Sequence, residues 1–189
     1  MAAYISSASG GGSAANPVVV KLNVSDPSQL NYNGSGGLAT LFAAINGAYY
    51  LNSGVYKYVS FDLSGSTIAN TYDMLSPYST YCNPKYLASI TLPNTLTNIS
   101  NIFQNCSSLT SITIPAGVTS SWNYTFKNCT SLTSVIMRPS TPPTLGTNMF
   151  DNTPAGLKIK VANGLLAAYT TNNTVDGWTA DIKAKVQAE

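Results

Sequence analysis

Apolar residues recur along the middle of the chain in one repeated phrase. It reads Leu-x-Ser-Ile or Leu-x-Ser-Val, with another apolar residue two positions later, and it begins at Leu87, Leu109 and Leu132, which are 22 and then 23 residues apart. Apolar and small polar residues alternate within each copy, which predicts a short β-strand with one buried face. Strands repeated at a fixed period of about 20–29 residues are typical of a solenoid, in which each coil stacks on its neighbour.

A second phrase keeps the same spacing between the predicted strands. It reads Phe-x-Asn-Cys-x-x-Leu from Phe103 and from Phe126, and Phe150 falls where the next aromatic residue is due. We expect these rings to fill the side of the core opposite the strands. Pro93 and Pro115 should end their strands, because proline cannot donate to a strand ladder.

The N-terminal part of the chain is divided by composition. Residues 1–16 are rich in Ala, Ser and Gly and predict a flexible tail. Residues 17–54 predict an N-terminal cap, with a strand at 18–24 and a helix at 38–45 whose apolar residues recur at helical spacing. The next strand begins the repeats, with Tyr58, Phe61 and Leu63 aligned with Leu87, Ile90 and Leu92.

The repeats are expected over residues 55–156 and a C-terminal cap over residues 157–189. The last strand is predicted at 157–161, followed by a short helix at 164–171 and a tail that carries Trp178. The predicted fold is therefore a short solenoid of the α+β class, with parallel strands and a strand-helix cap at each end. Caps are needed because the end coils would otherwise expose the core.

The chain carries very few charges. Charged residues are 8% of the sequence, against about 25% in ordinary globular proteins. No charged side chain lies between Lys85 and Lys127, and the net charge of +2 includes no basic cluster. A nucleic-acid partner is therefore not expected, since binding the phosphate backbone needs several Lys or Arg residues together. A surface with so little charge repulsion also favours association between copies.

The chain lacks the usual groups of an active site. It has no histidine, and no carboxylate lies between Asp73 and Asp151. The three cysteines, Cys82, Cys106 and Cys129, are an odd number for disulfides and have no Cys-x-x-Cys spacing for zinc. We interpret them as small apolar core residues. The sequence predicts no catalytic, cofactor or metal site, and hence a protein that is not an enzyme.

The location of the protein is inferred from the same composition. No apolar run reaches the roughly 20 residues that cross a bilayer, so no membrane-spanning segment is expected. The first residues lack the basic and apolar regions of a secretory signal. Either the protein is not exported or the signal has been removed. We favour an extracellular or cell-surface protein, because its surface is neutral and rich in Ser, Thr and Asn.

The outward positions of the repeat strands form the candidate interaction face. Side chains on one face of a strand alternate with those on the other, which assigns to this face Ser89, Thr91, Ser111, Thr113, Ser134 and Ile136. They are either solvated strand residues or a flat hydrogen-bonding face for a protein or a glycan. Aromatic anchors dominate many interfaces, and the candidates are Trp122, Tyr124, Tyr78 and Tyr81.

The two phrases together resemble a known repeat family. The run Leu109-Thr-Ser-Ile112-Thr-Ile114-Pro115-Ala-Gly-Val118, followed by Phe126-Lys-Asn-Cys129-Thr-Ser-Leu132, is similar to the BspA-like leucine-rich repeats of bacterial surface proteins. The resemblance covers about residues 55–182. The helix at 38–45, leading into residues 58–64, is similar to the lead-in of spirochaete members. The chain has Ser121-Trp122 where the family usually has Ile-Gly, so Trp122 is either a core substitution or an exposed anchor.

The resemblance implies a scaffold for interaction rather than for catalysis. It implies display at the cell surface and adhesion to host matrix proteins or to other bacteria. A second hypothesis follows from the low charge and the open ends of a solenoid: copies of the chain join head to tail in an extracellular filament or surface array. The expected partners are therefore proteins of the host or of a bacterial surface, or copies of the chain itself.

Overall fold

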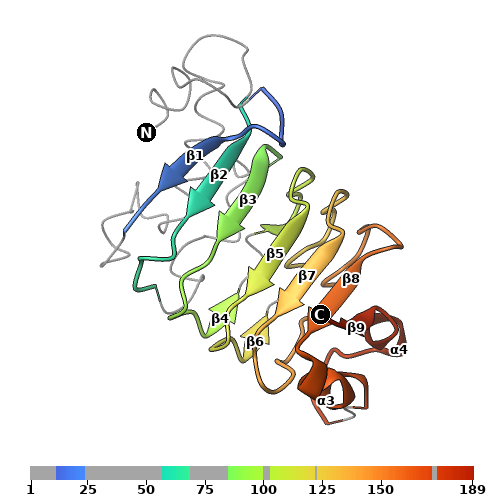
Figure 1. Cartoon of the computed structure of the whole chain (residues 1–189). Helices are drawn as coiled ribbons and strands as arrows, with labels where there is room; N and C mark the ends of the chain where they lie inside the picture. The colour runs from blue at the N-terminus through green and yellow to red at the C-terminus, as the bar shows by residue number, and fades with distance from the viewer. Residues whose placement is uncertain (1–11, 24–56, 69–84, 100–102, 122, 172–173) are drawn as a thin grey trace.

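In a computed structural model, the chain forms a parallel β-solenoid whose coils stack along one axis, as Figure 1 shows. The structure describes residues 12–23, 57–68, 85–99, 103–121, 123–171 and 174–189. The helix predicted at 38–45, Cys82 and three of the aromatic candidates, Tyr78, Tyr81 and Trp122, lie outside the described residues.

The repeat strands form two parallel sheets along the front of the solenoid. The first sheet contains β1 (Val18–Lys21), β2 (Val59–Asp62) and β3 (Leu87–Thr91), and the second contains β5 (Ser111–Ile114), β7 (Ser134–Met137), β8 (Lys158–Val161) and β9 (Val186–Ala188). Two short strands, β4 (Asn98–Ile99) and β6 (Ser120–Ser121), pair in parallel in a separate sheet. The predicted solenoid of parallel strands is confirmed, and β3 and β5 end before Pro93 and Pro115 as expected.

The register of the first repeat differs by one residue from the predicted alignment. Phe61 pairs with Ile90 as expected, but Val59 rather than Tyr58 pairs with Leu87. A register shift between Val59 and Ser60 accommodates one extra residue of β3. The prediction for Tyr58 is therefore wrong: Val59 is fully buried, whereas Tyr58 is half-buried.

Each of the strands β5, β7 and β8 is preceded by a segment that we call a return limb. The first return limb is residues 103–108, the second is 123–131 and the third is 146–156. Each return limb contributes one phenylalanine ring to a column. Phe103 and Phe126 stack with ring centroids 5.5 Å apart, and Phe126 and Phe150 with centroids 5.7 Å apart. Phe103 and Phe126 are fully buried, which confirms the predicted aromatic side of the core, and Phe150 is half-buried.

An asparagine ladder accompanies the ring column. Asn128 Nδ2 donates to Asn105 Oδ1 at 2.7 Å, and Asn152 Nδ2 donates to Asn128 Oδ1 at 2.8 Å. Their φ angles are 67° for Asn105, 62° for Asn128 and 55° for Asn152, in the left-handed region that Asn adopts more readily than most residues. Asparagine at this position thus both shapes the backbone of a return limb and links one coil to the next.

The C-terminal segment adds two helices and one more strand. A 3-10 turn, η4 (Asn163–Leu165), leads into α3 (Leu166–Thr170), which agrees with the helix predicted at 164–171. A second helix, α4 (Ala180–Lys183), follows. The prediction that 157–161 is the last strand is wrong, because β9 pairs in parallel with β8 and extends the sheet.

Two aromatic side chains of this segment attach it to the proline-rich stretch 139–143. Tyr169 Oη donates to the Pro139 carbonyl and Trp178 Nε1 to the Pro143 carbonyl, both at 2.8 Å. The two rings meet edge to face with centroids 5.2 Å apart, and both side chains are buried. Burial raises the pKa of the Tyr169 hydroxyl well above its usual range.

Candidate interaction face

The strand face has the alternation that the sequence predicts. Ser89 and Thr91 on β3, and Ser111 and Thr113 on β5, are exposed, whereas the residues between them are buried in the core. On β7, Ser134 and Ile136 are half-buried. The structure therefore places all six predicted strand residues on one side of the solenoid, with the four hydroxyls of β3 and β5 the most accessible.

A break in the sheet divides this face. β3 and β5 are not hydrogen-bonded to each other and belong to two separate sheets. A groove of about 600 Å³ lies between them, with Thr91 and Leu92 on one wall and Thr113 and Pro115 on the other. The candidate face thus consists of two hydroxyl pairs, one on each side of a groove, rather than one continuous ladder.

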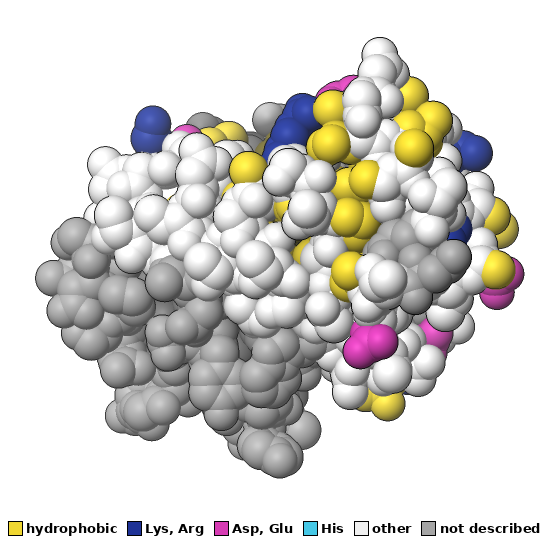
Figure 2. Space-filling model, turned by 90° about the horizontal axis from the view of Figure 1, so that it is seen from below, with side chains coloured by type: hydrophobic (Ala, Val, Ile, Leu, Met, Phe, Trp, Pro, Cys, Tyr) yellow, Lys and Arg dark blue, Asp and Glu magenta, His cyan; other side chains and the backbone are white. Residues whose placement is uncertain are grey.

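Charged side chains flank the neutral part of the face. Lys158 and Lys160 on β8 pair in register with Ser134 and Ile136 and occupy the same outward positions. On the other side, Lys21 and Asp62 form an ion pair at 3.7 Å. In Figure 2 much of the described surface is neither hydrophobic nor charged, and most charged side chains lie on the right, over the C-terminal part.

The two lysines were missing from the predicted face, although the sequence contained a signal for them. The segment Lys158-Ile-Lys-Val161 alternates in the same way as the earlier strands, so its lysines had to point outward like the serines and threonines. The face therefore changes along the solenoid from hydroxyl to cationic side chains.

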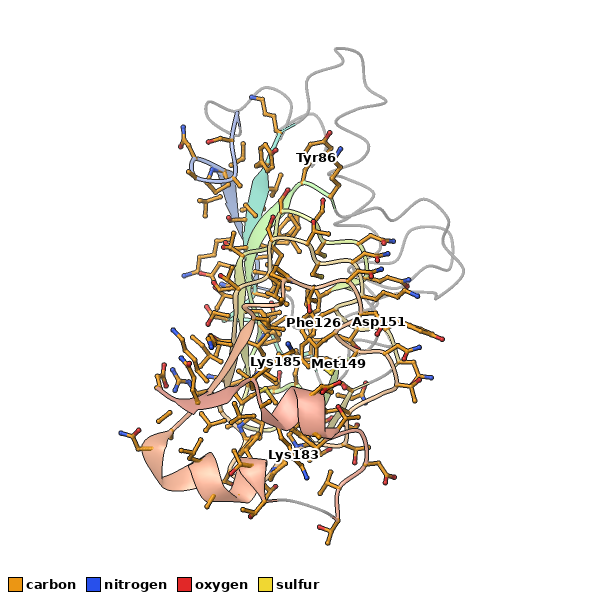
Figure 3. All side chains as sticks on the ribbon, turned by 90° about the vertical axis from the view of Figure 1, so that its right-hand side faces the viewer. Tyr86, Phe126, Met149, Asp151, Lys183 and Lys185 are labelled. Atoms are coloured by element: carbon orange, nitrogen blue, oxygen red, sulfur yellow. The ribbon has the colours of Figure 1, made fainter. Side chains whose placement is uncertain are left out.

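Tyr124 lies apart from the strand face. It belongs to the second return limb, and Figure 3 shows the strands edge-on at one side of the molecule, with Asp151 of the third return limb on the other. Tyr124 is half-buried, and Lys127 Nζ lies 4.8 Å from the centre of its ring. The predicted candidates thus fall on at least two surfaces, and the structure does not bring Tyr124 together with the strand hydroxyls.

The backbone at Tyr124 is unusual. Its φ of 61° lies in the left-handed region, which is costly for a bulky side chain. Asn148, which follows 24 residues later, occupies the corresponding place on the third return limb with a φ of 55°. Since the same conformation is filled by asparagine in the next coil, Tyr124 carries strain that its neighbouring repeat avoids.

Comparison with known proteins identifies the repeats. Residues 51–170 match the family model described as BspA type Leucine rich repeat region (6 copies). The chain belongs to this family. A search of curated proteins found no match to this BspA type chain.

A solved structure supports the fold of the BspA type repeats. The chain is similar to the crystal structure of the T. pallidum leucine rich repeat protein, with a TM-score of 0.51 and 19% sequence identity. The match covers 91% of this chain and 69% of that protein. At this level of identity the likeness establishes the architecture, while the family membership suggests a protein-interaction module.

The two described cysteines of the BspA type repeats lie in the core. Cys106 and Cys129 are fully buried and unpaired, and Cys129 Sγ donates to the Phe103 carbonyl at 3.0 Å. Burial raises the pKa of the Cys106 thiol well above its usual range, with the neighbouring Cys129 thiol adding to the effect. A buried thiol in this state is a poor nucleophile, which agrees with the structural role predicted for both residues.

No group of three or more His, Cys, Asp or Glu side chains that could hold a metal ion occurs in the described part of the chain. None of the helices described is long and apolar enough to cross a membrane.

Proposed function

We propose that the chain is a non-catalytic, adhesin-like interaction module of a secreted or cell-surface protein, which binds another protein through its strand face. The observation that carries this proposal is the two pairs of exposed hydroxyls on β3 and β5, which lie on either side of the groove. Solenoids commonly present such extended strand surfaces to their partners. A host matrix protein or a protein of another bacterial surface is the partner that we expect.

The chemistry of the face suits a protein surface better than a reaction. Hydroxyls both donate and accept hydrogen bonds. Ser89 Oγ donates to Ser60 Oγ on β2 at 2.7 Å, which fixes the orientation of the Ser89 hydroxyl. The groove between β3 and β5 adds apolar area next to these hydroxyls. Small neutral side chains also allow a partner's backbone to approach the sheet closely.

The test places a charge at the centre of the face. The variant Thr113→Lys introduces a long cation beside the groove, and Thr130→Lys is the matched control, because Thr130 is an exposed threonine on the second return limb. Binding to immobilised extracellular-matrix proteins and to whole bacterial cells is measured after thermal unfolding has shown that both variants are folded. We expect only Thr113→Lys to lose binding. Equal binding by both variants would remove the strand face as the site.

A second candidate function is a structural subunit of an extracellular filament or array. The outermost described strands, β1 and β9, present unlike parallel edges, and Val19 on β1 is 64% exposed. Contacts between unlike edges propagate without closing. Negative-stain microscopy and size-exclusion chromatography over a range of concentrations test this function. A 19.9 kDa monomer under all conditions would exclude it.

A further inference from the structure

The third return limb has the same backbone conformation as the second, but among the described residues its N–H groups at alternate positions lack the acceptors that those of the second limb have. In the second limb, the N–H groups of Tyr124, Phe126 and Asn128 donate to carbonyls of the third limb at 2.9–3.0 Å. The corresponding residues of the third limb are Asn148, Phe150 and Asn152. Their N–H groups donate to no acceptor among the described residues.

These three N–H groups point along the solenoid axis, toward its C-terminal end. The φ angles of Asn148 and Asn152 are both 55°, close to the 61° and 62° at the corresponding positions of the second limb. Since the two limbs share this conformation, their N–H groups point in the same direction. The third limb therefore ends the column with a row of unused donors at alternate residues, like the edge of a β-sheet.

A groove of about 810 Å³ lies on this side of the limb. One wall is formed by residues 146–151 and the other by the segment that contains α4, including Ile182 and Lys185. Figure 3 shows the molecule from its C-terminal side, and in it Met149 lies between Lys185 and Asp151, above α4. The groove thus occupies the place where the return limb of a further coil would lie.

The side chains in the groove also end repeating series. Phe150 is the last ring of the phenylalanine column and lines the groove, so the face of its ring turned away from Phe126 has no aromatic neighbour among the described residues. Asn152 donates to Asn128, yet its own Oδ1 accepts no hydrogen bond from the described chain, whereas Asn105 and Asn128 each accept one. Both series therefore lack their next member.

The charges around the groove are balanced and unpaired. Asp151 and Asp181 carry negative charge, Lys158 and Lys185 carry positive charge, and all four line the groove. None of them forms an ion pair with another described residue. Such a rim gives no preference for a strongly acidic or strongly basic occupant, which agrees with a neutral peptide segment.

We propose that this groove binds an extended, uncharged segment of a partner polypeptide as one further return limb. An aromatic side chain of the segment stacks on Phe150, and an Asn or Gln two residues later donates to Asn152 Oδ1. Carbonyls on either side of the aromatic residue accept from the N–H groups of the third limb, as those of Met149 and Asp151 accept from Phe126 and Asn128. This site is separate from the strand face and does not depend on the function proposed for that face.

The probe is a synthetic peptide with the sequence of residues 145–153 in which Asp151 is replaced by Asn, Leu-Gly-Thr-Asn-Met-Phe-Asn-Asn-Thr, so that it is a complete limb without a charged side chain. Amide hydrogen exchange is followed by NMR on the full chain. We expect the amides of Asn148, Phe150 and Asn152 to exchange rapidly in the free protein and slowly with the peptide. The amides of Tyr124, Phe126 and Asn128 are internal controls and should be protected in both states.

Two peptide variants and two protein variants sharpen the test. The peptide change Phe150→Ala removes the stacking ring and should weaken binding about tenfold or more, and Asn152→Ala in the peptide should weaken it less. In the protein, Ala155→Trp fills the groove from an exposed position and should abolish binding. The control Ala168→Trp places the same side chain at an exposed position of α3 and should leave binding unchanged.

Three results would overturn the proposal. The first is that the peptide fails to bind, and the second is that it protects amides other than those of the third limb. The third is that the amides of Asn148, Phe150 and Asn152 become protected from exchange without peptide as the protein concentration rises. In that last case a second copy of the chain occupies the groove, in place of a partner segment.

Discussion

Two junctions between neighbouring coils have almost the same sequence but differ in structure. At the junction of β5 and β7, the strands pair over their whole length, from Ser111 with Ser134 to Ile114 with Met137. At the junction of β3 and β5, the phrase Ser-Ile-Thr faces an identical Ser-Ile-Thr, yet the strands are not hydrogen-bonded to each other. The hydrophobic phrase alone therefore does not close a junction.

One residue accounts for part of the difference. Arg138, directly after β7, donates its backbone N–H to the Ile114 carbonyl at 3.1 Å. The residue at the same position after β5 is Pro115, which has no N–H to donate to the coil before it. The open junction, between β3 and β5, is hydrogen-bonded away from the strand face. There β4 pairs with β6, and the Thr119 N–H donates to the Thr97 carbonyl at 2.9 Å. The solenoid can thus open on its strand face while its other side stays paired.

The largest loss of stability is expected from the part of the solenoid from β5 onward, whose strands pair without a break and which we call the closed half. Phe126 lies there, at the centre of the phenylalanine column. Phe126→Ala should lower the free energy of unfolding by about 3–5 kcal/mol, because it leaves a cavity between two rings. Chemical denaturation measures this change. Phe150→Ala is the matched comparison and should cost clearly less, because Phe150 is half-buried at the end of the column. Equal losses would show that the groove beside Phe150 is filled.

Alkaline pH should weaken the C-terminal segment of the closed half through Tyr169. Burial raises the pKa of Tyr169 in the folded state above its unfolded value of about 10. Its stabilising effect is therefore complete below pH 10 and decreases as the pH rises above that value, by up to about 1.4 kcal/mol per pH unit. Urea denaturation between pH 8 and pH 11 measures this slope.

The variant Tyr169→Phe is the control for the alkaline effect. It should be less stable at neutral pH by about 1 kcal/mol, because Tyr169 Oη no longer donates to the Pro139 carbonyl. Above pH 10 its stability should fall less steeply than that of the parent chain. If both proteins lose stability with the same slope, the titration of Tyr169 is not the cause.

Sequence periodicity predicted the elements that repeat. The spacing of Leu87, Leu109 and Leu132 located the strands, and the aromatic phrase located the column of Phe103, Phe126 and Phe150. Both signals arise because every coil buries the same positions against its neighbours. The outward positions of the strand face follow from the same alternation.

Features that depend on a departure from the repeat were not predicted. The break between β3 and β5, the extra residue near Val59 and the final strand β9 each occur once, so periodicity contains no signal for them. The row of unused N–H groups on the third return limb depends on which coil comes last and on what covers it. The asparagine ladder could have been found, since Asn105, Asn128 and Asn152 keep the repeat spacing.

The closed junction should open partly when its donor is removed. Arg138→Pro deletes the N–H that reaches Ile114 and also ends the ion pair between Arg138 and Glu189. We expect a loss of about 1–2 kcal/mol in unfolding free energy. Arg138→Ala keeps the N–H, loses only the exposed ion pair and should cost less than about 1 kcal/mol. Equal values for the two variants would show that the backbone hydrogen bond does not hold this junction.

A smaller, stabilising effect is expected on the second return limb. Tyr124→Asn places in the left-handed conformation the residue that the next coil has at Asn148. Relief of backbone strain outweighs the lost contact with Lys127, for a net gain of about 0.5 kcal/mol. Tyr124→Ala is the control, since it loses the ring without gaining a residue suited to that conformation. A Tyr124→Asn protein no more stable than the Tyr124→Ala protein would contradict the assignment of strain.

The smallest effect is expected from supplying the missing donor at the open junction. Pro115→Ala introduces an N–H opposite the Leu92 carbonyl, where the β5–β7 junction has the N–H of Arg138. Since proline also restricts the unfolded chain, its removal costs about as much as the new hydrogen bond contributes, and the net change should be within about 0.5 kcal/mol. The informative measurement is therefore hydrogen exchange at position 115. A protected amide there would show that the missing N–H keeps β3 and β5 apart, whereas rapid exchange would mean that the packing of the two coils holds the groove open.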